Sequence, residues 1–308
     1  MKVAIIGAGG FIGTALTRKI LQNRDVRCVF LTDSADFPVP DDHRIETVRG
    51  SFADPRIRRK VVDGADKVIL LAAILGGAAE SNYDLSRQIN VDATLDLFEY
   101  LRQTRPETRL VFASTIAVYA EPLPAIVDDC TPFGPTMVYG AQKLMMEIAL
   151  SNFQRRGWLD GVAIRPSGVM ARDDADARLK TAFMSRVFYA VKRGEDLELP
   201  VAPQSTTWLT SVDTVSSNFS HAAFLSAREL GNERAFTLPA LRLSFEELVA
   251  ALFRKYPESR SRITYAPNDE LISLFGAFPQ LVTETADRLG FQRDADADDL
   301  VSRALSVP

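Results

Sequence analysis

The chain has 308 residues, 46% of them hydrophobic and 25% charged, with a formal net charge of −4; a chain of this length buries a large core, as one big domain or as a domain with a smaller lobe. It has no basic patch, which argues against a nucleic-acid partner, and no apolar run near the roughly 20 residues that cross a bilayer, which argues against a membrane partner. Two cysteines, Cys28 and Cys130, give neither a disulfide framework nor metal-ligand spacing, so we expect no metal and a reducing, cytoplasmic location.

The first predicted element is a strand that leads directly into a glycine-rich turn. Residues 2–6 are apolar and β-branched, as in a buried parallel strand. The turn, Gly7-Ala-Gly-Gly10-Phe-Ile-Gly13, precedes a helical stretch at 14–23. In such a turn the first glycine permits the bend, the second lets the backbone approach a pyrophosphate, and the third lets helix and strand pack closely. We therefore predict a dinucleotide site with contacts from Gly7, Gly10, Phe11, Ile12 and Gly13.

The second predicted strand indicates which dinucleotide to expect. It covers residues 27–32 and ends in Asp33, at the distance from Gly13 where a carboxylate binds the adenosine ribose hydroxyls. No Arg or Lys lies between Asp33 and His43 to receive a 2′-phosphate. The pattern predicts NAD rather than NADP as cofactor, with an ordinary turn residue as the alternative interpretation of Asp33.

Strands and helices go on alternating through the first half of the chain. Further strands are predicted at 45–48, 67–71, 108–113 and 161–164, and helices at 54–63, 84–104 and 136–156. This alternation predicts an α/β fold with a doubly wound parallel sheet of the Rossmann type. The rhythm changes after about residue 166. We predict an NAD-binding domain over 1–165 and a mainly substrate-binding lobe over 166–308, with segments that return to the Rossmann sheet.

Tyr139 and Lys143 have the clearest chemical meaning. They stand four residues apart on the predicted helix 136–156, so their side chains share one face. The pKa of a free tyrosine is about 10. A nearby ammonium group favours the phenolate and lowers that pKa, and a positively charged nicotinamide would add to the effect. The pair predicts a phenol that passes a proton to or from a substrate oxygen.

Together these motifs resemble the extended, epimerase-like branch of the short-chain dehydrogenase/reductase superfamily, the NAD-dependent epimerase/dehydratase family. The resemblance covers nearly the whole chain. Its other markers are Leu71-Ala-Ala73, Asn90-Val-Asp-Ala-Thr94, Phe112-Ala-Ser-Thr115 and Arg165-Pro166. Within this branch the chain is similar to the D-erythronate dehydrogenases, in runs that include Ile116-Ala-Val118, Arg165 to Arg172 and Trp208-Leu-x-Ser211.

The resemblance implies roles for residues near Tyr139. Thr115, helped by Ser114, would hold the substrate oxygen, with two buried hydroxyls bonding the backbone as the alternative. Asn90 would order the loop behind the active site, unless it lies on a solvated polar face. The implied cofactor contacts beyond the glycine turn and Asp33 are Leu71, Ala72, Ala73, Asn90, Tyr139, Lys143, Pro166 and Val169.

The resemblance also implies two substrate contacts in the lobe. Arg172 would bind a carboxylate, with a surface ion pair to Asp173 or Asp174 as the alternative. Trp208 would either wall the pocket or pack the lobe. The chain departs from the erythronate enzymes at Asp173-Asp-Ala-Asp-Ala177, where they carry Pro-Gly-Lys-Pro-Asn beside the substrate. The added negative charge favours a monocarboxylic or neutral polyol-like substrate over diacids and nucleotide diphosphate sugars.

These observations predict an NAD-dependent dehydrogenase that oxidises a secondary alcohol of a small, D-erythronate-like sugar acid. One rival is a nucleotide-sugar epimerase or dehydratase with tightly bound NAD. Another is a non-catalytic dinucleotide sensor, although such proteins commonly lack the tyrosine–lysine pair. The resemblance further implies a homodimer through helices 84–104 and 136–156.

Overall fold

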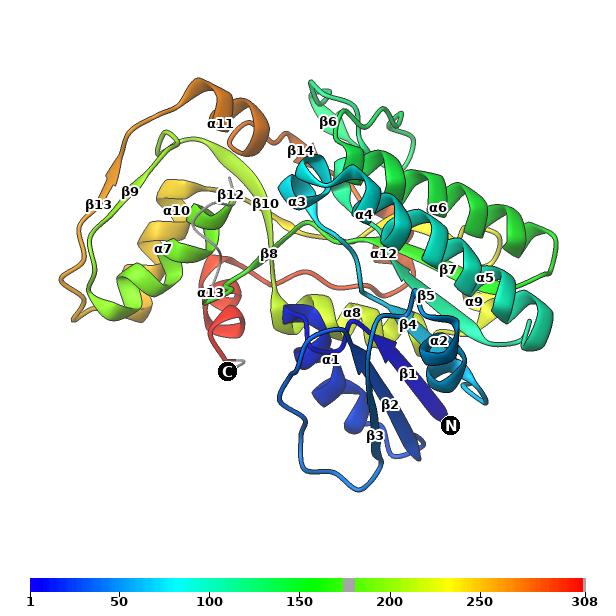
Figure 1. The fold of residues 1–308 in the computed structure, drawn as a ribbon. Helices are drawn as coiled ribbons and strands as arrows, with labels where there is room; N and C mark the ends of the chain where they lie inside the picture. The colour runs from blue at the N-terminus through cyan, green and yellow to red at the C-terminus, as the bar shows by residue number, and fades with distance from the viewer. Residues whose placement is uncertain (174–180, 307–308) are drawn as a thin grey trace. The chain divides into compact units, whose positions relative to one another are not determined.

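The computed structural model describes residues 1–173 and 181–306, which fall into two compact units (Figure 1). Unit 1 comprises residues 1–121, 132–165 and 216–237, and unit 2 comprises 122–131, 166–215 and 238–308. Each unit has its own hydrophobic core. Within the described residues, no helix is both long enough and apolar enough to cross a membrane.

Unit 1 is built on a parallel sheet of seven strands. Their order is β11-β7-β5-β4-β1-β2-β3. The strands are β1 (Lys2–Ile6), β2 (Cys28–Asp33), β3 (Ile45–Arg49), β4 (Lys67–Leu70), β5 (Arg109–Ala113), β7 (Asp160–Arg165) and β11 (Ala235–Thr237). From β1 the sheet is extended on one side by β2 and β3 and on the other side by β4, β5, β7 and β11. Ligands of such sheets bind at the carboxyl ends of the strands, beside the point where the strand order reverses. The predicted doubly wound α/β fold is confirmed.

Unit 1 contains the predicted helices, one of them interrupted, and also two short helices that were not predicted, at 76–81 and 227–230. Its helices are α1 (Phe11–Leu21), α2 (Pro55–Val62), α3 (Gly76–Ser81), α4 (Tyr83–Arg87), α5 (Ala93–Thr104), α6 (Val138–Arg155) and α9 (Ala227–Leu230). The helix predicted over 84–104 is divided by a π-helical turn at Gln88–Asp92. Such turns inside a helix are frequent at functional sites, and this one carries Asn90.

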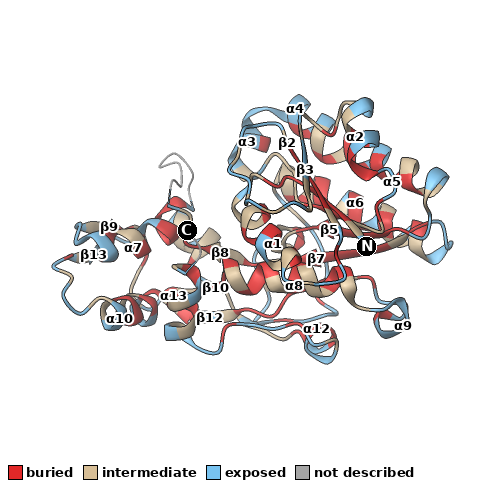
Figure 2. Cartoon of the chain, turned by 90° about the horizontal axis from the view of Figure 1, so that it is seen from below, coloured by how far each residue is buried: buried red, intermediate tan, exposed pale blue. Residues whose placement is uncertain are grey.

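Apolar strands and helix faces form the core of unit 1, shown red in the burial view of Figure 2. Leu70 of β4 and Phe112 of β5 pack with Leu97 and Phe98 of α5 in one cluster. The rings of Phe98 and Phe112 meet edge to face with centroids 6.0 Å apart. Because the middle strands are covered on both faces, they appear as continuous apolar runs in the sequence.

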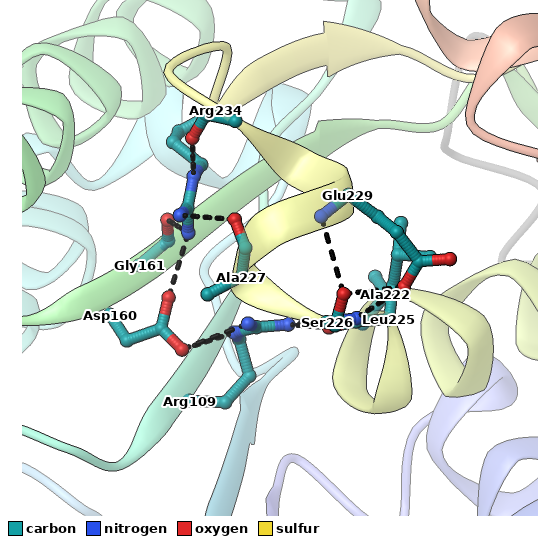
Figure 3. Close-up of polar contacts among 10 residues, drawn as sticks. Arg109, Asp160, Gly161, Ala222, Leu225, Ser226, Ala227, Glu229 and Arg234 are labelled. Atoms are coloured by element: carbon teal, nitrogen blue, oxygen red, sulfur yellow. Dashed lines mark hydrogen bonds and ion pairs between the residues drawn. The ribbon is translucent and has the colours of Figure 1, made fainter.

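A buried ionic network attaches the returning segment 216–237 to the sheet (Figure 3). Arg109 at the start of β5 donates to the carbonyl oxygens of Ala222 at 3.0 Å and Leu225 at 2.6 Å. Asp160 at the start of β7 accepts from Arg109 Nε at 2.8 Å and from Arg234 Nη1 at 2.7 Å. Burial acts to raise the pKa of Asp160, but the two guanidinium groups hold it below its ordinary value. The carboxylate thus remains charged between two arginines.

Unit 2 combines short strands with helices. Its strands are β6 (Ile126–Val127), β8 (Gly168–Met170), β9 (Leu197–Leu199), β10 (Thr206–Ser211), β12 (Leu241–Ser244), β13 (Ile263–Tyr265) and β14 (Gln280–Leu281). Its helices are α7 (Ala182–Arg193), α10 (Phe245–Lys255), α11 (Asp269–Phe275), α12 (Glu284–Arg288) and α13 (Ala297–Ala304), while α8 (Val212–Phe224) spans the division between the units. Phe188, Leu252 and Leu300 belong to the core of this unit.

Candidate active site

The glycine turn after β1 has the geometry that the sequence predicts. Gly7 has φ of +90°, and its N–H donates to the carbonyl of Thr32 at 2.9 Å. A Cβ on Gly7 would lie 2.6 Å from the backbone N of Ala72, and a Cβ on Gly13 would lie 2.3 Å from the carbonyl oxygen of Gly7. Both contacts are too short for any side chain. The backbone of this turn is therefore tightly packed against β4 and α1, and Gly10 begins α1 as its N-cap.

Asp33 lies beside this turn. Its carboxylate accepts hydrogen bonds from Gly9 N at 3.0 Å and from Ala35 N at 3.1 Å. Leu71 and Ala72, which follow β4, both donate backbone N–H groups to the carbonyl of Ile6, at 2.8 and 3.0 Å. The turn, the end of β2 and the end of β4 therefore lie together at the carboxyl edge of the sheet, where a dinucleotide is expected.

Asn90 holds the segment after β4. Only 1% of Asn90 is exposed, so the alternative interpretation, in which it lies on a solvated face of the helix, is wrong. Its Oδ1 accepts from Ile74 N at 2.8 Å, while its Nδ2 donates to Ile74 O at 2.9 Å and to Gln142 Oε1 at 2.8 Å. Gln142 is on α6, so the side chain of Asn90 ties the loop to the helix that carries Tyr139 and Lys143.

The structure brings Tyr139, Lys143 and Thr115 together. Lys143 Nζ donates to the carbonyl of Ala113 at 2.7 Å and lies 5.8 Å from the centre of the Tyr139 ring. The hydroxyl of Thr115 lies near enough to the phenol of Tyr139 to act on its pKa. It also accepts from Ala117 N at 3.1 Å, which caps the short 3₁₀ turn Ile116–Val118. The three side chains can serve one substrate oxygen.

The pKa of Tyr139 does not shift in the direction expected from the sequence. Burial raises it above its ordinary value, and the hydrogen bond from Thr115 opposes this only in part. Burial also lowers the pKa of Lys143 to about 7, against the opposing charge of Glu147. Burial disfavours the charged form of either group, and the ammonium of Lys143 is bound to Ala113. The protein side chains by themselves therefore favour the neutral phenol.

The structure shows a buried carboxylate, that of Glu147, near Tyr139 and Lys143. Glu147 was not among the site residues predicted from the sequence. Glu147 lies one turn beyond Lys143 on α6 and accepts a hydrogen bond from the Ser114 hydroxyl. The Ser114 proton is therefore engaged by a carboxylate, whereas the sequence offered a substrate contact or a backbone bond. The sequence could have pointed to Glu147 through its spacing, because Tyr139, Lys143 and Glu147 follow one another at intervals of four residues. Arg165 is a possible partner for the carboxylate.

The remaining site residues belong to unit 2. Trp208 is 1% exposed, its Nε1 donates to the carbonyl of Pro279 at 2.7 Å, and its ring packs edge-on to Phe278. This geometry fits the interpretation in which Trp208 packs the lobe. Pro166 follows β7, and Val169 of β8 pairs with Thr210. Arg172 is half-buried.

Asp173, at the edge of the acidic stretch, pairs with Arg193. Asp174 and Asp176 lie outside the described residues. Among the residues that the structure does describe, no group of three or more His, Cys, Asp or Glu side chains is arranged to hold a metal ion.

Comparisons with known proteins place the chain in a family. A sequence model of the NAD dependent epimerase/dehydratase family matches residues 3–218. D-erythronate dehydrogenase of Cupriavidus necator is 32% identical over 98% of this chain and 97% of its own length. D-erythronate dehydrogenase of Haemophilus influenzae is 27% identical over 99% of both chains.

Solved structures of other proteins share the fold of this chain over nearly its full length. The nucleoside-diphosphate-sugar epimerase from Agrobacterium tumefaciens superimposes with a TM-score of 0.89 at 27% identity, over 98% of this chain and 92% of that one. A GalE-like L-threonine dehydrogenase from Cupriavidus necator gives a TM-score of 0.87 at 20% identity, over 99% of both chains, and shows the shared fold.

The Rossmann sheet and the family match define an NAD-dependent oxidoreductase of the extended short-chain dehydrogenase/reductase class. The chain belongs to the NAD-dependent epimerase/dehydratase family, and its cofactor is NAD.

Proposed function

We propose that this enzyme oxidises a secondary alcohol of a small sugar acid of the D-erythronate type to the corresponding oxo acid. The observation that carries the proposal is the full-length likeness to two D-erythronate dehydrogenases, 32% and 27% identical. The family match supplies the NAD-dependent chemistry, and the site residues supply the means to move a proton.

The residues of unit 1 fit a bound NAD. The tightly packed turn at Gly7, Gly10 and Gly13 presents backbone rather than side chains, as a pyrophosphate requires. Asp33, already next to Gly9 N, would bind the adenosine ribose hydroxyls. We assign further contacts in unit 1 to Phe11, Ile12, Leu71, Ala72, Ala73 and Asn90, and we assign two contacts from unit 2, those of Pro166 and Val169.

Proton transfer is assigned to Tyr139. Its phenol oxygen takes the proton of the substrate hydroxyl while Thr115 positions that oxygen by a hydrogen bond. Lys143 would bond the nicotinamide ribose and supply positive charge. Bound NAD⁺ supplies the hydride acceptor and a second positive charge. Because burial raises the pKa of Tyr139, these charges are needed to make the phenolate accessible near neutral pH. Arg172 would pair with the substrate carboxylate.

A nucleotide-sugar epimerase with tightly held NAD is the second candidate. The observation that favours it is the likeness to the Agrobacterium nucleoside-diphosphate-sugar epimerase. An epimerase returns the hydride to its substrate, so it releases no NADH. A dehydrogenase forms one NADH for each product molecule. The appearance of free NADH therefore separates the two candidates.

A screen of aldonic and sugar acids with NAD, followed by NADH absorbance, tests the proposal. We expect activity on tetronates such as D-erythronate, and weak or no activity on aldaric diacids and nucleotide diphosphate sugars. Arg172→Ala should raise KM for an acid substrate far more than for a neutral polyol. Interconversion of nucleotide sugars without NADH release, and no oxidation of any sugar acid, would overturn the proposal.

We also propose a homodimer formed through the α4–α5 stretch and α6. These helices lie side by side in unit 1 (Figure 1). They expose large apolar side chains, Tyr83, Leu85, Leu95, Met145 and Ile148, of which Met145 is 52% and Ile148 59% exposed. Such side chains gathered on adjacent helices are typical of a surface that is covered by a partner. A second copy of the chain would extend this into a four-helix interface.

A further inference from the structure

Glu147 lies on α6, on the same face of the helix as Tyr139 and Lys143, to which proton transfer and cofactor binding are assigned. Tyr139, Lys143 and Glu147 are spaced four residues apart on α6 and share one face of the helix. Lys143 and Glu147 are each 2% exposed. A charged side chain removed from water in this way needs compensating partners.

Glu147 has such partners on two neighbouring strands. Arg165, at the end of β7, donates from Nε at 2.9 and 3.1 Å and from Nη2 at 2.6 Å. Ser114, directly after β5, donates its hydroxyl to the same carboxylate. Burial acts to lower the pKa of Arg165, but its hydrogen bonds to Glu147 and the negative charge of Glu147 raise it. The carboxylate and guanidinium form a tightly bonded buried pair.

Glu147 is also the carboxylate that acts on Lys143. Its negative charge opposes the lowering of the Lys143 pKa that burial causes. Several other charged or titratable groups on the elements around Lys143 pair away from it. Asp92 pairs with Arg87, Asp96 pairs with Arg58, and Glu80 accepts from the backbone N of Val138. Tyr119 is hydrogen-bonded to Thr237 and also acts on Arg165, while Asp84 and Tyr83 of α4 are exposed.

We propose that Glu147 is a positioning residue that keeps the Lys143 ammonium charged for its contact with the cofactor and fixes the Ser114 hydroxyl next to Thr115. The inference rests on the proposed function only in assigning Lys143 to NAD, and it is independent of which substrate is oxidised. Glu147 itself acts through Lys143 and Ser114 and needs no contact with substrate.

The test is the pH dependence of NADH binding, measured by fluorescence titration without substrate. All variants carry Tyr139→Phe, so that the phenol does not titrate. In this parent we expect the affinity to fall as pH rises through the pKa of Lys143, because the charged donor is lost. Adding Glu147→Gln should move the midpoint of this fall to lower pH by about one unit or more. A substitution that only loosened the fold would not move the midpoint.

Three further variants make the result interpretable. Lys143→Met should abolish the pH-dependent part of binding, which assigns the midpoint to Lys143. Glu147→Asp keeps the charge and should keep the midpoint near that of the parent. Glu147→Gln combined with Arg165→Met also removes the guanidinium that would otherwise lose its carboxylate, and it should still lower the midpoint, so the test stands if the single variant does not fold.

An unchanged midpoint in the Glu147→Gln variants, with affinity or melting temperature altered equally at every pH, would overturn the proposal and leave Glu147 a structural residue. A parent whose affinity does not depend on pH would overturn it as well. Failure of the sugar-acid screen would refute the proposed substrate but would leave this binding experiment unaffected.

Discussion

The proposed proton transfer depends on the hydroxyl group of Tyr139, which is the only group that Tyr139→Phe removes. Tyr139→Phe should reduce kcat about 100- to 10,000-fold, the usual contribution of a general acid–base group. NADH affinity and melting temperature should stay near those of the wild type, because the buried ring is kept and only its hydroxyl is lost. Steady-state kinetics together with NADH titration would show this. Retention of more than about a tenth of the activity would refute the assigned proton transfer.

Asp33 is expected to determine the choice of dinucleotide. A 2′-phosphate would meet its carboxylate and be repelled, so the wild type should prefer NAD by a wide margin. Asp33→Asn keeps an oxygen for Gly9 N but removes the charge, and it should narrow the ratio of kcat/KM for NAD to that for NADP. Asp36→Ala is the matched control, since Asp36 is exposed and pairs with Arg49. Equal efficiency of the wild type with both cofactors would contradict the assignment.

Lys143 should make the free energy of unfolding depend on pH. Its pKa falls from an ordinary 10.5 to about 7 on folding, so between these values the unfolded chain binds a proton that the folded chain lacks. Unfolding free energy should therefore rise with pH in this interval, by at most about 1.4 kcal/mol per pH unit, relative to Lys143→Met. Below the interval both states are protonated and the difference becomes constant. Urea unfolding at several pH values would measure the difference, and parallel curves for the two proteins would refute it.

At the scale of elements, α6 must lie very close to the turn that carries Thr115. A Cβ on Gly140 would be 2.1 Å from the carbonyl oxygen of Ala117. Gly140→Ala should therefore displace the helix, lower the melting temperature and reduce kcat by separating Tyr139 from Thr115. Gly77→Ala on α3 is the control, because a Cβ there meets nothing within 4 Å; it should leave the melting temperature unchanged or slightly higher. Wild-type kinetics in Gly140→Ala would show that this close approach is not required.

At the scale of the whole molecule, the expectation is a dimer. Ile148→Glu would place a charge in the proposed apolar interface, and burying an unpaired charge is costly. Light scattering should give a dimer mass for the wild type and a monomer mass for this variant at micromolar concentration. Val39→Glu, at another exposed apolar position, should remain dimeric. A monomeric wild type would remove the support for this interface.

Local patterns in the sequence determined most of unit 1. The glycine turn requires its residues for steric reasons that involve only neighbouring segments. The long apolar runs and helical periods identify β1 to β5, β7 and most of the helices around them. The strands of unit 2 could not be found in this way. Most of them have two to four residues, which is too short to show a period, and they exist because distant segments such as β9 and β13 pair.

The sequence by itself determined the family, the cofactor class and the pairing of Tyr139 with Lys143 on one helix face. Only the tertiary structure decided which partners each buried group has. Glu147 meets Arg165 and Ser114 because β5, β7 and α6 pack together, and no spacing along the chain encodes that meeting. The upward pKa shift of Tyr139 likewise comes from burial by the folded chain, which outweighs the opposing effect of Thr115.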